Sequence, residues 1–126
     1  MSAEHPQDPI APRSVSLRDG SRRVLDGYGR AVASVAVVHK PRDLDELREL
    51  LSRAHAEGLP VAMRGSGRSY GDAAINAGGA VLDLRAMARI LAWDPDTGIV
   101  EVEPGVTIEQ LWRLGLPDGW WPAVVP

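Results

Sequence analysis

The spacing of hydrophobic positions changes several times along the chain, and each change predicts an element. Residues 35–38 form a short, mostly β-branched apolar run, which is typical of a buried strand. A capping signature at Asp43 is followed by leucines that recur on one helical face, so residues 43–57 are predicted to form a helix. Residues 61–64 and 80–84 are predicted as further strands. A helix that connects strands in this way usually joins parallel neighbours.

Towards the C-terminus the pattern becomes that of antiparallel structure. Residues 90–93 and 99–103 flank an Asp-Pro-Asp-Thr-Gly turn, and the second run alternates valine with glutamate, which predicts a hairpin with one solvated face. A capping box at Thr107 and Gln110 begins a second predicted helix, which ends near Gly115. The predicted fold class is therefore α/β (α+β): a small parallel β-α-β subdomain followed by the start of an antiparallel subdomain.

Two features predict the domain boundaries. Residues 1–21 are expected to form a disordered tail, because their first part is polar, rich in proline and unlike a secretory signal. Residues 22–126 are expected to form one incomplete domain, since residues 119–126 are apolar where a natural end would be solvated. We therefore expect a truncated N-terminal portion of a larger domain. Apolar runs fall far short of the ~20 residues of a membrane helix, so we expect no transmembrane segment and a cytoplasmic location.

Composition excludes several classes of function. The chain of 126 residues has no cysteine, which rules out disulfides, cysteine-ligated zinc, iron–sulfur clusters and a cysteine nucleophile. Its 14 basic and 17 acidic residues give a net charge of −3 with no concentrated basic run, which argues against nucleic acid as a partner. We assign no metal site and no catalytic residue within the chain.

The glycines are concentrated in one segment. Five of the 13 glycines lie between Arg64 and Ala80, and the segment Arg64-Gly-Ser-Gly-Arg-Ser-Tyr-Gly-Asp72 directly follows a predicted strand. Closely spaced glycines allow successive N–H groups to point to one side and allow the backbone to approach a pyrophosphate. The Ser66 and Ser69 hydroxyls can add hydrogen bonds, and Arg64 or Arg68 can add positive charge. The segment is therefore a candidate anion-binding loop.

Other interpretations of the same loop are possible. A P-loop requires a lysine that this segment lacks. A nicotinamide-binding Rossmann loop fits the glycine spacing, and Asp83 lies where a ribose-binding acid would be. However, only nine residues separate Gly71 from Val81, too few for a packed crossover helix. An ordinary surface loop with turn glycines is the remaining alternative.

Several motifs together resemble the FAD-linked oxidases whose FAD-binding domain is of the vanillyl-alcohol-oxidase or p-cresol-methylhydroxylase (PCMH) type. They occur in the family's order and near its spacing, at residues 25–30, 64–72, 72–79, 81–84, 102–106 and 116–120. The resemblance covers residues 22–126 and implies a first FAD subdomain with a small parallel sheet, joined to an antiparallel one. It places the pyrophosphate of the cofactor between the two.

The resemblance also implies roles for individual residues. Contacts with the pyrophosphate are implied for Gly65, Ser66, Gly67, Arg68 and Ser69, with Arg64 beside them. Tyr70 would lie near the flavin, and Asn76 would be a further support. Many relatives attach FAD covalently through a histidine at the position that is Arg68 here, so the resemblance implies noncovalent FAD.

The family likeness implies oxidation of a sugar-type alcohol by hydride transfer to FAD. The motifs are most similar to members that act on decaprenylphosphoryl-ribose at C2, a step of cell-wall arabinan biosynthesis that also needs a partner reductase. Such a lipid-linked substrate would place the parent enzyme at the membrane or cell envelope, while the chain alone is expected to be inactive.

Three alternatives remain from the sequence. One is an oxidase of alditols or sugar lactones that also uses FAD. Another is a non-catalytic binding module that uses an exposed edge at Trp120 and Trp121. The third is an NAD(P)-binding domain, which would need a helix immediately after Gly71.

Overall fold

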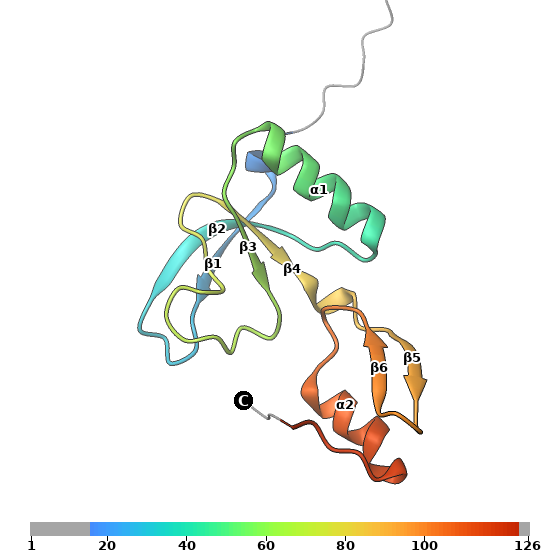
Figure 1. Cartoon of the computed structure of the whole chain (residues 1–126). Helices are drawn as coiled ribbons and strands as arrows, with labels where there is room; N and C mark the ends of the chain where they lie inside the picture. The colour runs from blue at the N-terminus through green and yellow to red at the C-terminus, as the bar shows by residue number, and fades with distance from the viewer. Residues whose placement is uncertain (1–15, 124–126) are drawn as a thin grey trace, which may run out of the picture.

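The computed structural model describes residues 16–123, which form two lobes connected in sequence (Figure 1). The sheet lobe, residues 16–86, contains one α-helix, four strands and two 3-10 turns: η1 (Leu17–Asp19), β1 (Ser21–Asp26), β2 (Ala33–His39), α1 (Leu44–Ala56), β3 (Val61–Arg64), β4 (Ala80–Asp83) and η2 (Leu84–Ala86). The hairpin lobe, residues 90–123, contains β5 (Ile90–Asp94), β6 (Ile99–Val102), α2 (Ile108–Gly115) and η3 (Leu116–Asp118).

Strand β4 occupies the middle of the sheet lobe. The strand order is β1-β2-β4-β3, with β4 parallel to both of its neighbours and β1 antiparallel to β2. The predicted parallel β-α-β unit is therefore confirmed, and the antiparallel β1 is an addition that the sequence did not predict. All four residues of β4 are buried, as expected of a strand that is covered on both faces.

Helix α1 covers one face of this sheet. Its apolar stripe includes Leu47 and Ala54, which pack with Leu82 and Ala80 of β4 respectively. The opposite face of β4 carries Val81, which packs with β2. The helix begins where the sequence predicts, because the Asp43 side chain accepts a hydrogen bond from the N–H of Glu46 at 2.9 Å.

The ordered part of the chain begins earlier than predicted. Residues 1–15 lie outside the described residues, but residues 16–21, also assigned to a disordered tail, form η1 and the start of β1. Leu17 is only 1% exposed and packs against Ala54. The Glu57 carboxylate accepts hydrogen bonds from the Ser16 hydroxyl at 2.7 Å and from the Leu17 N–H at 3.1 Å. One apolar residue among polar ones has no periodicity, which is why the pattern did not reveal this anchor.

The hairpin lobe holds every tryptophan of the chain. Strands β5 and β6 are antiparallel, as predicted, with an irregularity between Ile90 and Ala92. The predicted capping box at the start of α2 is present, with both of its reciprocal hydrogen bonds. Trp112 of α2 lies 5.8 Å from Trp121, measured between ring centroids. Trp120 donates from Nε1 to the carbonyl of Pro95 at 2.7 Å, which ties the segment after α2 to the hairpin turn.

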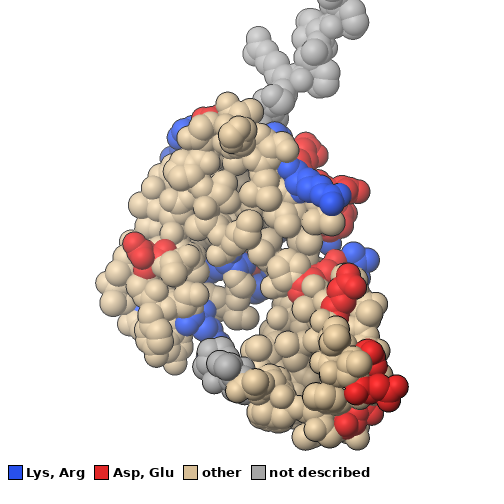
Figure 2. Space-filling model, in the orientation of Figure 1, with Lys and Arg blue, Asp and Glu red and all other residues tan. Residues whose placement is uncertain are grey.

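A compact junction joins the two lobes. The Gly105 N–H donates to the carbonyl of Met87 at 2.7 Å, and the Glu103 N–H donates to the carbonyl of Arg89 at 3.0 Å. The Glu103 carboxylate accepts in return from the Arg89 N–H at 2.8 Å and from its Nη2 at 2.7 Å. This pairing lowers the pKa of Glu103. Figure 2 shows the surface hollowed between the lobes, with Lys and Arg side chains on the sheet-lobe side of the hollow.

Candidate functional site

The glycine-rich segment forms a long loop, residues 65–79, between β3 and β4. In Figure 1 it extends below the sheet, on the side where the hairpin lobe lies. Gly67 and Gly71 have φ values of +73° and +62°, which side-chain-bearing residues rarely adopt. Residues 71–74 form a turn rather than a helix, and the Ile75 N–H donates to the carbonyl of Asp72 at 3.0 Å. The crossover helix that an NAD(P)-binding domain needs after Gly71 is therefore not formed, which excludes that alternative.

The loop is held against the turn that follows β1. The Tyr28 N–H donates to the carbonyl of Ser69 at 3.0 Å. The rings of Tyr28 and Tyr70 meet edge to face, with centroids 5.2 Å apart. Gly27 permits this approach, because a Cβ there would lie 2.1 Å from the carbonyl oxygen of Gly71. The structure thus adds Tyr28 to the site; its motif was recognised in the sequence, but the spacing alone did not place it beside the loop.

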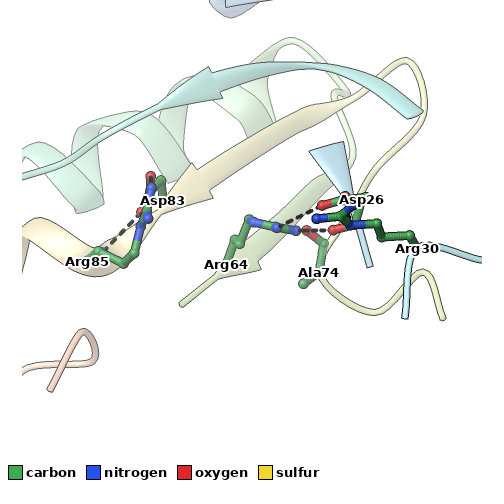
Figure 3. A network of polar contacts seen from close by, with 6 residues as sticks. All are labelled: Asp26, Arg30, Arg64, Ala74, Asp83 and Arg85. Carbon is green, nitrogen blue, oxygen red and sulfur yellow. Dashed lines mark hydrogen bonds and ion pairs between the residues drawn. The ribbon is translucent and has the colours of Figure 1, made fainter. Parts of the chain in front are cut away.

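Arg64 lies beneath the loop and is used within the fold. Its Nη1 donates to the carbonyl of Asp26 at 3.0 Å and to that of Ala74 at 3.1 Å (Figure 3). Its Nη2 lies 4.0 Å from the Asp26 carboxylate, which is also 3.8 Å from Arg30. The side chain is only 14% exposed. The sequence favours Arg64 as a positive charge for a bound phosphate, whereas in the structure its Nη1 joins two backbone segments.

Asn76 supports the return of the loop to the sheet. Its Nδ2 donates to the carbonyl of Pro60 at 2.8 Å and to that of Ala80 at 3.3 Å. A Cβ at Gly79 would lie 2.2 Å from the same nitrogen, so a glycine is needed there. The amide group of Asn76 therefore fastens the end of the loop to the residue before β3 and to the first residue of β4.

The first part of the loop presents unused hydrogen-bond donors. Within residues 16–123, the N–H groups of residues 65–69 donate no hydrogen bond. Ser66, Arg68 and Ser69 are exposed, and in the same described range their side chains form no hydrogen bond or ion pair. In the part of the chain that the structure describes, no heavy atom outside the adjacent residues lies within 4 Å of a Cβ built at Gly65, so the backbone there is open to a ligand. A run of free amides, two hydroxyls and one guanidinium matches the chemistry of a pyrophosphate.

Asp83 has a structural role at the end of β4. It is 5% exposed, and its carboxylate accepts from the Arg85 Nε at 2.8 Å and Nη2 at 2.6 Å (Figure 3). The hydrogen bonds from Arg85 hold the pKa of Asp83 below its ordinary value. Its oxygens are engaged by Arg85, as expected of a turn residue at a strand end rather than of a ribose ligand.

Comparison with known proteins places the chain in a family. The model of the FAD binding domain family matches residues 35–126. Over 103 residues the chain is 43% identical to decaprenylphosphoryl-beta-D-ribose oxidase from Mycolicibacterium smegmatis, covering 81% of this chain and 22% of that protein. It is 31% identical over 96 residues to L-gulono-1,4-lactone dehydrogenase from Mycobacterium tuberculosis, covering 71% of this chain and 22% of that protein.

A solved structure has the same fold. The chain superposes on alkyldihydroxyacetonephosphate synthase with a TM-score of 0.56 at 18% identity, covering 71% of this chain and 17% of that one. The chain thus spans about a fifth of the length of the curated relatives it matches. Among residues 16–123, no helix has the length and apolar character needed to cross a membrane. The sequence match and the shared fold together show that the chain belongs to the FAD-binding domain family of the FAD-linked oxidoreductases, and that its cofactor is FAD.

Proposed function

We propose that residues 22–126 form the pyrophosphate-binding part of an FAD site. The observation that carries this proposal is the row of N–H groups at residues 65–69, which have no hydrogen-bond acceptor among the described residues and belong to an exposed stretch of backbone. Free amide donors on a glycine-rich turn bind phosphate oxygens without needing to break bonds within the protein. The residues assigned to the pyrophosphate are Gly65, Ser66, Gly67, Arg68 and Ser69.

The remaining site residues act around this core. Tyr70 is 77% exposed and stands on the loop beside Tyr28, so we assign it to the neighbourhood of the flavin ring. Asn76 holds the loop from the sheet side. Arg68 stands where many relatives carry the histidine that links to FAD, and arginine cannot form that link, so the cofactor is held noncovalently. When bound, FAD accepts the hydride that an alcohol loses on oxidation.

For the larger protein we propose oxidation of decaprenylphosphoryl-ribose at C2. The 43% identity to an enzyme named for that substrate supports the proposal. We propose a cytoplasmic location for the chain, while a lipid-linked sugar would place the larger protein at the membrane or cell envelope. A partner reductase would be required to complete an epimerisation. The 126-residue chain itself is proposed to be inactive, because no residue in it is assigned to the reacting atoms.

A sugar lactone is the second candidate substrate. The 31% identity to L-gulono-1,4-lactone dehydrogenase favours it, although over a smaller share of the chain. Oxidation of either substrate would use the same cofactor, so the two proposals differ only in the substrate that the rest of the protein binds.

Two experiments test these proposals. Titration of the 126-residue chain with FAD, followed by flavin fluorescence with NADPH as the control ligand, should give saturable binding of FAD alone. For the substrate, residues 22–126 should replace the matching segment of two hosts, the Mycolicibacterium oxidase and the Mycobacterium tuberculosis lactone dehydrogenase. The oxidase chimera should retain flavin and the activity of its host, while the dehydrogenase chimera should lose activity. A well-folded oxidase chimera without flavin would contradict the proposed site, and activity kept only by the lactone dehydrogenase chimera would favour the second candidate.

A further inference from the structure

We propose that Arg64 is a positioning residue for the cofactor loop: its guanidinium is the support on which residues 65–74 fold, and it does not act as a phosphate ligand. This inference rests on the proposed FAD-pyrophosphate site. According to this proposal, one largely buried side chain fixes the conformation of the loop. The glycines only allow that conformation.

The contacts of the guanidinium join three parts of the chain. Through Nη1 it connects the end of β1, at the carbonyl of Asp26, with the return of the loop, at the carbonyl of Ala74. Through Nη2 it lies directly under Gly67, where an added Cβ would be 2.3 Å away. The N–H groups of residues 65–69 donate no hydrogen bond to any residue between 16 and 123, so the path of this segment depends on such outside supports.

The position of Arg64 in the sheet explains why it points inward. It is the last residue of β3 and pairs in register with Asp83 of β4. Asp83 is already bound by Arg85 at 2.6 Å, so it does not draw the Arg64 side chain towards β4. The guanidinium instead reaches the carbonyls of Asp26 and Ala74, and its charge is shared with the Asp26 carboxylate at 4.0 Å.

Lysine is expected to replace this group poorly. The two hydrogens of Nη1 are directed to two different carbonyls, and the guanidinium is planar, which suits the close approach of Gly67. A lysine ammonium carries the same charge on a shorter chain and has no plane. A phosphate ligand would tolerate this exchange better, because an ammonium also attracts phosphate.

The test compares four variants of the 126-residue chain: Arg64→Lys, Arg64→Met, Arg68→Met and, as a matched surface control on α1, Arg48→Met. Without ligand, amide hydrogen exchange is measured at Tyr28, whose N–H is bonded to the carbonyl of Ser69, with the Ala80 N–H as internal reference. With FAD, the dissociation constant is measured at low and high salt. Far-UV circular dichroism checks that each variant folds.

Both Arg64 variants should speed exchange at Tyr28 about tenfold relative to Ala80, while Arg68→Met and Arg48→Met should not. Both should raise the FAD dissociation constant about 10- to 100-fold, because only the fraction of loops in the binding shape takes up ligand. The FAD dissociation constant of Arg64→Lys should depend on salt as strongly as that of the wild type, while that of Arg68→Met should depend on salt less strongly. If Arg64→Lys binds FAD like the wild type and leaves Tyr28 protected, the positioning role is refuted.

The proposed pyrophosphate site and the proposed role of Arg64 can be refuted separately. A wild-type chain that binds no FAD would refute the proposed pyrophosphate site, yet exchange at Tyr28 would still report whether Arg64 orders the loop. Normal FAD binding by the wild type together with unchanged Tyr28 exchange in Arg64→Met would refute only the role of Arg64.

Discussion

The junction between the lobes should be highly sensitive to one added methyl group, at Gly105. A Cβ at this position would lie 2.2 Å from the carbonyl oxygen of Leu84 and 2.6 Å from that of Met87. Both neighbours are backbone atoms of η2 and its end, so no side chain can rotate away. Gly105→Ala must therefore push the segment after β6 away from η2.

The size of the effect follows from these contacts. Overpacking of this kind costs about 1–3 kcal/mol. Displacement also removes the 2.7 Å hydrogen bond from the Gly105 N–H to the carbonyl of Met87, and a donor left without a partner costs about 1–3 kcal/mol. Alanine offsets about 0.4–1 kcal/mol of this loss, because it restricts the unfolded chain more than glycine does. We therefore expect Gly105→Ala to lower the free energy of unfolding by about 2–4 kcal/mol.

The aromatic residues provide the assay. All four tryptophans lie in the hairpin lobe, at positions 93, 112, 120 and 121, and both tyrosines lie in the sheet lobe, at positions 28 and 70. Urea unfolding followed by tryptophan fluorescence reports one lobe, and far-UV circular dichroism, to which α1 contributes, also reports the other. Gly65→Ala is the control, because an added Cβ there meets none of residues 16–123 within 4 Å apart from its chain neighbours, and the φ of Gly65 is not positive. A loss for Gly105→Ala within about 0.5 kcal/mol of that control would show that the junction is not close-packed.

Four further results are expected. Arg68→Glu should abolish saturable FAD binding by placing a carboxylate against the pyrophosphate; an unchanged titration would remove Arg68 from the site. Flavin bound to the chain should be released completely by acid precipitation, and flavin that stays with the pellet would contradict noncovalent binding. Thr107→Ala should lower stability by about 1 kcal/mol through loss of the α2 capping box, whereas Thr107→Ser, which keeps the capping hydroxyl, should not. The pKa of Asp83 is lowered in the folded state, so the ionised carboxylate stabilises the fold above the unfolded pKa of about 3.9, and this stabilisation is lost as the pH falls further. The difference in unfolding free energy between the wild type and Asp83→Asn should therefore narrow below about pH 4.

The elements with a clear period or cap were predictable from the sequence. The predicted helix over 43–57 and the strand over 61–64 correspond closely to α1 and β3. These segments carry their own signals, namely a capping aspartate with spaced leucines and a short apolar run bounded by turn residues. The antiparallel hairpin and the capping box of α2 were predicted for the same reason.

The parts that depend on distant contacts were not predictable. Strand β1 alternates poorly, because its residues are mostly exposed, and Leu17 is a single buried residue in a polar stretch. At the site, the donors of residues 65–69 were predicted from glycine spacing. The inward turn of Arg64 depends on the carbonyls of Asp26 and Ala74, 38 and 10 residues away in sequence, and no local pattern contains that information.

The central place of β4 also has a consequence for the order in which the molecule can be assembled. During synthesis β2, α1 and β3 are made before β4. In the finished sheet β2 and β3 do not pair with each other, because β4 lies between them, so the sheet stays incomplete until residues 80–83 have been made. Those residues follow directly after the loop of residues 65–79. The chain therefore cannot close its sheet without also bringing the two ends of this loop together. The loop that is proposed to bind the pyrophosphate thus takes its place in the same folding event that completes the core.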